Sequence, residues 1–280
     1  MSGITWLGII ITKFFDMSKI AIIGGGNLGT AIAEGLVKSG FVPAGDIIVT
    51  RRNTALLADL AAKGVVVTAD NAEAVRQAET VILAVKPYNV RDILKELSPA
   101  LSEDRHILVS VVTGVWMEEL QQAAGKSIPL FRAMPNTAIA IQESMTCISH
   151  VHATESQVSY IKSLFDTLGK TVMIDEKLMD ASTVLGACGI AYALRFIRAN
   201  IQGGIEIGFD AATASLIAAQ TVKGAAQLLI GTGRHPEQEI DKVTTPKGCT
   251  IAGLNEMEHQ GFSSSLIKGI VASYVKILKP

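Results

Sequence analysis

The stretch KIAIIGGGNLGTAIAEGLVKSG (19–40) decides the fold. It begins as a short β-branched run and ends with apolar residues at helical spacing, and the glycines between them follow the pattern GxGxxG. In this context the first glycine allows a tight turn, the second lets backbone N–H groups approach a pyrophosphate, and the third lets helix pack on strand. The alternative is a glycine-rich turn without a ligand. The predicted dinucleotide contacts are Gly24, Gly26, Asn27, Leu28 and Gly29.

The next apolar run, DIIVT (46–50), bears on which dinucleotide is bound. NAD-binding sites carry an acidic residue at the carboxyl end of the second strand, whereas Asp46 precedes this strand. The strand ends instead in Thr50, Arg51 and Arg52. Guanidinium groups bind a 2′-phosphate through charge-assisted hydrogen bonds, so we predict NADPH, with NADH possible. The alternative is that the two arginines are a solvated loop pair.

Short β-branched runs alternate with helical segments from Lys19 to Asp175. This alternation predicts an α/β fold with a mainly parallel sheet and helices on both faces, a Rossmann-type dinucleotide-binding domain. Two weaker strand candidates, 144–150 and 170–175, are expected to extend the same sheet.

Beyond Asp175 the strand signal ends, and helical segments rich in Ala, Leu and Ile follow near 178–208, 210–231 and 248–279. Faces so rich in small apolar residues are commonly buried against a second subunit. We therefore divide the chain into three parts. They are an N-terminal extension (1–16), an NAD(P)-binding Rossmann domain (17–175) and an all-helical domain for dimerisation and substrate (176–280).

The carboxyl ends of later strands are further candidates, because ligands of open α/β sheets bind outside those ends. The runs AVKP (84–87) and RAMPN (132–136) lie at such ends. Lys86 could instead cap its strand, and an Asn before Thr is often a turn residue. The predicted cofactor contacts here are Ala84, Val85, Lys86, Pro87 and Asn136.

Composition narrows the class of protein. The chain has 280 residues and a formal net charge of -1. A general nucleic-acid-binding protein carries an excess of Lys and Arg, which this chain does not have, so we expect small-molecule and protein partners. Its three cysteines form no CxxC pair and indicate a reducing compartment, the cytoplasm. His150 and His152 have no third ligand nearby, so no metal is predicted.

An apolar stretch, ITWLGIIITKFF (4–15), precedes a second plausible start at Met17. A spanning helix needs roughly 20 apolar residues, so this one is too short to cross a bilayer by itself. We interpret it as an extension and expect no membrane association. A weak membrane anchor is the alternative.

Six motifs occur together in one order. They are GGGNLG (24–29), AVKP (84–87), RAMPNTA (132–138), GACGIAY (186–192), HPEQEIDKV (235–243) and TPKGCTIAGLNEME (245–258). With these motifs in this order, the chain resembles pyrroline-5-carboxylate reductases from about Lys19 to its C-terminus. The resemblance implies NADPH- or NADH-dependent reduction of 1-pyrroline-5-carboxylate to L-proline, the last step of proline biosynthesis. It also implies a homodimer built by the helical domain, which could assemble further into a ring.

The resemblance also implies a substrate site. The family's loop matching 245–250 holds the substrate carboxylate, and its last threonine offers a hydroxyl to the ring nitrogen, which makes Thr250 the predicted catalytic residue. As an alternative, Thr250 could be the N-cap of a helix starting at Ile251. The predicted substrate contacts are Val243, Thr245, Gly248, Cys249 and Thr250.

Two motifs depart from the family pattern. GACGIAY replaces SGSGPAY, and Lys247 stands where the family has glycine, which either adds a favourable charge or disturbs a turn that needs positive φ. These departures motivate an alternative, an NADP-binding regulatory or redox-sensing paralogue without turnover. A second alternative is a 3-hydroxyacid dehydrogenase. The helix expected to carry its catalytic lysine, GIAYALRFIRAN (189–200), contains none.

Overall fold

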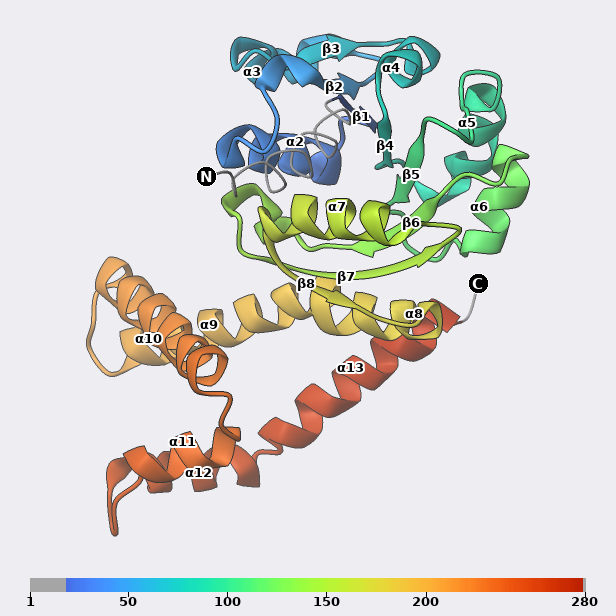
Figure 1. Cartoon of the computed structure of the whole chain (residues 1–280). Coiled ribbons are helices and arrows are strands. Elements are labelled where there is room, and N and C mark those ends of the chain that lie inside the picture. Colours follow the sequence, from blue (N-terminus) through green and yellow to red (C-terminus); the bar gives the residue numbers. More distant parts are fainter. Residues whose placement is uncertain (1–18, 279–280) are drawn as a thin grey trace, which may run out of the picture. The chain divides into compact units, whose positions relative to one another are not determined.

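The computed structural model describes residues 19–278 (Figure 1). They form two compact units that divide between Ala187 and Cys188. The first unit is α/β and the second is helical, as the sequence predicts. The helix expected over 248–279 is two helices, because Gly261, with φ of 79°, ends the first of them.

One sheet organises the first unit. Its strand order is β3-β2-β1-β4-β5-β6-β7-β8, and every neighbouring pair is parallel except β6 and β7. The two weaker strand candidates are β7 and β8, which extend the sheet as predicted. The strands are β1 (Ile20–Ile23), β2 (Ile47–Thr50), β3 (Val66–Thr68), β4 (Thr80–Leu83), β5 (Ile107–Ser110), β6 (Leu130–Met134), β7 (Ser144–Val151) and β8 (Gly169–Met173).

Helices cover both faces of this sheet because the central strands are apolar on both sides. In β1, Ile20 and Ile22 pack into one core with α2, α3 and α7, while Ala21 and Ile23 pack into another with α4, α5 and α6. The predicted parallel sheet between two helical layers is therefore confirmed. The helices are α2 (Asn27–Ser39), α3 (Ala58–Ala62), α4 (Asn71–Gln77), α5 (Val90–Leu97), α6 (Met117–Ala124) and α7 (Glu155–Asp166).

Short helical turns join these elements. A π-helix, η6 (Thr183–Cys188), follows the short helix α8 (Met179–Ser182), and such turns are frequent at functional sites. The 3₁₀ turns are η1 (Ala44–Asp46), η2 (Thr54–Leu57), η3 (Pro87–Asn89), η4 (Thr137–Ile141) and η5 (Glu176–Leu178).

The second unit consists of helices with little core of their own. Among the described residues of α9 to α13 only Ala214 and Ala218 are buried. Helix α13 meets α9, where the Tyr192 hydroxyl lies 2.6 Å from Ser273 Oγ. The helices are α9 (Gly189–Glu206), α10 (Ala211–Thr232), α11 (Pro236–Val243), α12 (Cys249–His259) and α13 (Phe262–Leu278).

Candidate functional site

The glycine loop after β1 can be built only with glycines at two of its positions. Gly24 has φ of 108°, and a Cβ added there would lie 2.6 Å from the Ala84 carbonyl oxygen. A Cβ on Gly29 would lie 2.1 Å from the carbonyl oxygen of Gly24. These close approaches let α2 start directly beside the ends of β1 and β4.

Gly26 has the opposite surroundings. It is exposed, and a Cβ built on it would meet nothing within 4 Å. Gly26 is the N-cap of α2 and supplies no side chain to the orphan amides there, and the first turn carries no acidic residue. Asn27 is exposed, whereas Leu28 packs on the core. The arrangement leaves room and free backbone donors for a phosphate group.

The end of β2 braces this loop. The Thr50 hydroxyl is buried and accepts a hydrogen bond of 3.1 Å from the Gly24 amide. Arg51 Nη1 donates to the Gly25 carbonyl oxygen at 2.8 Å. Arg52 is exposed and makes no ion pair with any residue between 19 and 278. The two arginines therefore differ, since Arg51 holds the loop and Arg52 is free to meet an anion.

The end of β4 forms the opposite side of the loop. Atoms of Ala84 and Val85 would be the nearest neighbours of a Cβ on Gly24, so these two residues lie beside the glycine loop. Lys86 and Pro87 are exposed and start η3, with Lys86 at the N-cap position. Lys86 forms no salt bridge within the described part of the chain. Its ammonium group is thus available at the carboxyl edge of the sheet.

Asn136 follows β6 at the same edge. Its side-chain oxygen accepts from the Ala138 amide at 3.0 Å, and its Nδ2 donates to the Gly186 carbonyl at 3.3 Å. Gly186 belongs to the π-helix η6 and opens the altered motif GACGIAY. Asn136 therefore works as a turn residue that also ties the π-helix to the end of β6.

In the second unit, the predicted substrate loop is a closed turn between α11 and α12. The Gly248 amide donates to the Thr245 carbonyl oxygen at 2.9 Å, and Lys247 takes the left-handed conformation with φ of 61°. This turn has Pro246 at its second position and positive φ at its third, as in a type II turn. Lys247 thus occupies the positive-φ position without opening the turn.

Helix α12 starts at Cys249 with Gly248 as its N-cap, so the alternative role of Thr250 as N-cap is wrong. A Cβ on Gly248 would lie 2.5 Å from Thr245 Oγ1 and 3.0 Å from the Thr245 carbonyl oxygen, so the closed turn favours glycine here. Thr250 lies in the first helical turn, half-buried, and its hydroxyl has no hydrogen-bond partner among residues 19–278. Val243 ends α11 and is 64% exposed.

Cys147 offers no competing nucleophile. Cys147 is half-buried, and burial raises the pKa of its thiol above the ordinary value, so it stays protonated near neutrality. Within the described ranges no group of three or more His, Cys, Asp or Glu residues could hold a metal ion.

A buried charged cluster escaped the sequence analysis, which treated Arg132 only as part of a turn. Arg132 is 1% exposed, and its Nη1 donates to Glu176 Oε1 at 2.9 Å. The same carboxylate oxygen accepts from the Met117 amide at 2.8 Å. The Arg132 guanidinium also lies 5.5 Å from the centre of the Trp116 ring. No local pattern marks this cluster, because its members come from distant segments.

The fold and the glycine loop define a Rossmann-type, dinucleotide-binding oxidoreductase with a helical second domain. Residues 19–114 match the family described as "NADP oxidoreductase coenzyme F420-dependent". Residues 176–279 match the family described as "Pyrroline-5-carboxylate reductase dimerisation".

Individual relatives cover more of the chain. It is 46% identical over 273 residues to pyrroline-5-carboxylate reductase 1 of Dictyostelium discoideum, which covers 93% of this chain and 49% of that protein, so the chain spans about half of that relative. It is 40% identical to pyrroline-5-carboxylate reductase 2 of the same organism, with 97% and 96% covered. The solved pyrroline-5-carboxylate reductase of Coxiella burnetii has a TM-score of 0.86 and 28% identity, covering 94% of this chain and 98% of that one. The chain belongs to the pyrroline-5-carboxylate reductase family, as its motifs predict.

Proposed function

We propose that the chain reduces 1-pyrroline-5-carboxylate to L-proline with NADPH as the hydride donor. The observation that carries this proposal is the open space at Gly26, where a Cβ would meet nothing within 4 Å, beside Gly24 and Gly29, which admit no side chain. The exposed Arg52, which has no ion pair within residues 19–278, follows at the end of β2. Family membership supplies the substrate. Neither the regulatory paralogue nor the 3-hydroxyacid dehydrogenase is favoured by relatives that carry the reductase name over almost the whole chain.

The residues at this opening fit NADPH. The amides at the start of α2 would hold the pyrophosphate, Arg52 would meet the 2′-phosphate, and Lys86 and Asn136 would lie along the sheet edge where the nicotinamide end extends. When bound, the cofactor supplies a hydride to the carbon of the substrate C=N bond, and a proton from solvent completes the amine. The chain's own contribution is positioning.

On the substrate side, the turn 245–250 would hold the carboxylate. The first turn of α12 contains no acidic residue, and Gly248 offers no capping side chain, so its amides are free to bind an anion. The unpartnered Thr250 hydroxyl would orient the ring nitrogen. Lys247 would add a positive charge beside the carboxylate.

We also propose a homodimer formed through the helical unit. The described residues of α9 to α13 bury only two alanines, so this unit needs a further apolar surface, and the match of residues 176–279 to a dimerisation family supports a second copy of the unit as that surface. The segment Glu176–Glu206 is long and apolar enough to cross a membrane by length and composition alone, but a helix that pairs with another subunit passes the same test. A higher ring-like assembly and a cytoplasmic location remain expectations, and the free thiols support the latter.

The reaction is tested by following NADPH absorbance with 1-pyrroline-5-carboxylate as substrate. We expect turnover by the natural chain and a loss of about tenfold or more in kcat/KM for Thr250→Ala, because one hydrogen bond to a charged group is lost. Thr250→Ser keeps the hydroxyl and should retain most of the activity. No turnover by the natural chain would refute the reaction, and unchanged kinetics of Thr250→Ala would refute only the role of Thr250.

A further inference from the structure

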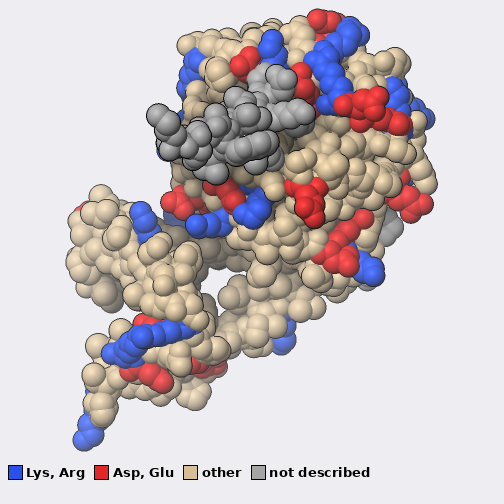
Figure 2. All heavy atoms as spheres, in the orientation of Figure 1, with Lys and Arg blue, Asp and Glu red and all other residues tan. Residues whose placement is uncertain are grey.

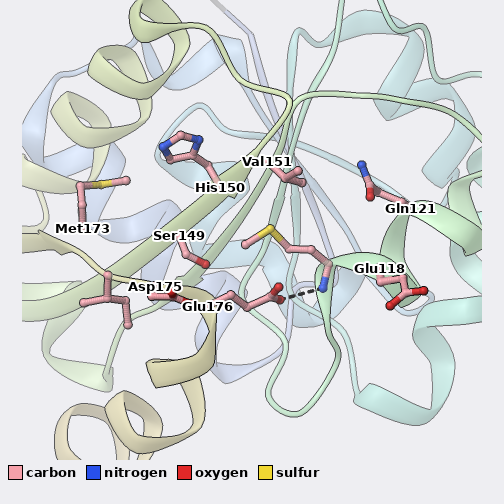
Figure 3. Close-up of a pocket in the computed structure, with 10 residues that line it drawn as sticks. Glu118, Gln121, Ser149, His150, Val151, Met173, Asp175 and Glu176 are labelled. Carbon is pink, nitrogen blue, oxygen red and sulfur yellow. Dashed lines mark hydrogen bonds between the residues drawn. The ribbon is translucent and has the colours of Figure 1, made fainter.

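A cavity lies in the first unit, away from the glycine loop. It measures about 590 Å³ and is formed by α6, β7 and the segment after β8 (Figure 3). We call it the β7 pocket. Its wall includes Val151, which pairs with Leu130 at the beginning of β6. The predicted cofactor contact Asn136 follows the other end of that strand, so the β7 pocket belongs to a different edge of the sheet.

The β7 pocket is lined by negative charge. Glu118 and Asp175 contribute exposed carboxylates, and no Lys or Arg is among its lining residues. Glu176 contributes a third carboxylate, which is paired with the buried Arg132 behind the wall. His150 comes next to Ser149 on β7 but stands on the other face of the strand, with its ring 5.6 Å from that of Phe131. Carboxylates in a hollow with low-dielectric walls concentrate the potential that attracts a cation.

The inner wall carries a polar group without a partner. Ser149 is 4% exposed, and its hydroxyl makes no hydrogen bond within the described residues. Its side chain points from β7 toward Glu176 in Figure 3. Directly across the strand pair lies Arg132, whose Nε and Nη2 also lack a hydrogen bond. Asp180 Oδ1 lacks one too and forms an ion pair with that Nη2 at 4.0 Å.

The unpaired Ser149 hydroxyl and Asp180 Oδ1 can accept a hydrogen bond from a ligand, whereas the Arg132 nitrogens are donors and need an acceptor. A buried polar group left without a hydrogen bond costs about 1–3 kcal/mol, and buried orphans in native proteins are normally explained by water, an ion or a bound molecule. Every unpaired buried side-chain atom found among residues 19–278 belongs to Arg132, Ser149 or Asp180, so the orphans are concentrated at one place. That place adjoins the β7 pocket.

The lining also distinguishes between kinds of cation. The described residues contain no cluster of His, Cys, Asp and Glu able to hold a metal ion. The walls instead combine the carboxylates with apolar side chains, those of Met117 and Met173 among them. Methionine side chains adapt to flexible alkyl groups.

We propose that the β7 pocket binds a small organic ammonium ion with an alkyl stem. The ammonium group is held by Glu118 and Asp175 and donates to the Ser149 hydroxyl, and the stem packs on the methionines. The site is independent of the proposed reaction, because a direct binding measurement tests it without any turnover.

The test is isothermal titration calorimetry of the full chain with 1,4-diaminobutane, and with 1,4-butanediol as the uncharged probe of the same length. We expect the diamine to bind with one site per chain and the diol not to bind. Absence of diamine binding at millimolar concentration, or equal binding of both probes, would overturn the proposal.

Variants locate the site. The double variant Glu118→Gln and Asp175→Asn should weaken diamine binding about tenfold or more, because charge-assisted contacts are lost, and Ser149→Ala should weaken it further. Glu96→Gln, at an exposed glutamate of α5, removes one charge elsewhere and should leave affinity unchanged. Circular dichroism checks that each variant is folded. Equal weakening by Glu96→Gln, or full affinity in the double variant, would show that the β7 pocket is not the binding site.

Discussion

The two units of this chain differ in how far they bury their apolar residues within the chain itself. In the first, strands β1, β2, β4 and β5 are buried along their whole length and helices cover both faces. In the second, helices α9, α11, α12 and α13 contain no buried residue. Large apolar side chains of the second unit are exposed, and the visible surface of α10 carries few charged side chains (Figure 2).

This contrast separates two kinds of stability. The first unit gains its hydrophobic free energy within one chain, so its fold should persist at any protein concentration. The second unit exposes Leu216, Ile230 and Leu194 at 72%, 68% and 58%. Such a surface is stable in water only when another apolar surface covers it, which couples folding of the second unit to association.

The largest effect is expected from placing a charge on that surface. Leu216→Glu should convert the proposed dimer to monomer, because an unpaired carboxylate buried at an interface costs several kcal/mol. Activity should fall with it. Leu56→Glu changes an equally apolar residue that is 60% exposed, but in the first unit, and should leave both mass and activity unchanged.

Light scattering on a sizing column measures the mass of each variant. A Leu216→Glu protein that keeps its dimer mass and its melting temperature would show that the exposed face of α10 is not covered by a partner. A Leu56→Glu protein that dissociates would remove the contrast between the units.

The second effect is local to the glycine loop. Gly29→Ala places a Cβ 2.1 Å from a backbone oxygen and should destabilise the first unit by about 3 kcal/mol while abolishing NADPH binding. The methyl of Gly26→Ala meets no atom of residues 19–278, so this variant should keep the melting temperature and lose affinity only because the methyl occupies the phosphate position. Thermal melting and NADPH fluorescence titration separate the two. Equal behaviour of these variants would refute the distinct roles of the two glycines.

The sequence predicted those parts of the fold that depend on local pattern. The glycine loop, the alternation of strands and helices and the loss of strand signal after Asp175 follow from residue type and spacing within short windows. The cluster of Arg132 with Ser149 could not be foreseen in this way. It depends on β7 running antiparallel to β6, which puts the two residues opposite each other, and direction is not encoded in a strand's own residues.

The candidate site shows the same limit at the level of single side chains. Arg51 and Arg52 are indistinguishable as a sequence pair, and only the packing of β2 beside the loop directs Arg51 onto the Gly25 carbonyl. Likewise, a threonine before a helical run is a plausible N-cap, yet the turn closed between Thr245 and Gly248 starts α12 two residues earlier. Such outcomes depend on turn geometry rather than composition.

The smallest effect is expected from Arg52→Ala. This variant changes a surface contact of the first unit without changing its core. Arg52 is exposed and unpaired within the described chain, so its removal should leave the melting temperature unchanged. Affinity for NADPH should fall about tenfold, because charge-assisted hydrogen bonds to the 2′-phosphate are lost, while affinity for NADH, which lacks that phosphate, should not change. Arg51→Ala should differ by lowering both affinities, since Arg51 holds the loop itself. If Arg52→Ala weakened NADH and NADPH equally, the cofactor preference would have to originate elsewhere than at the end of β2.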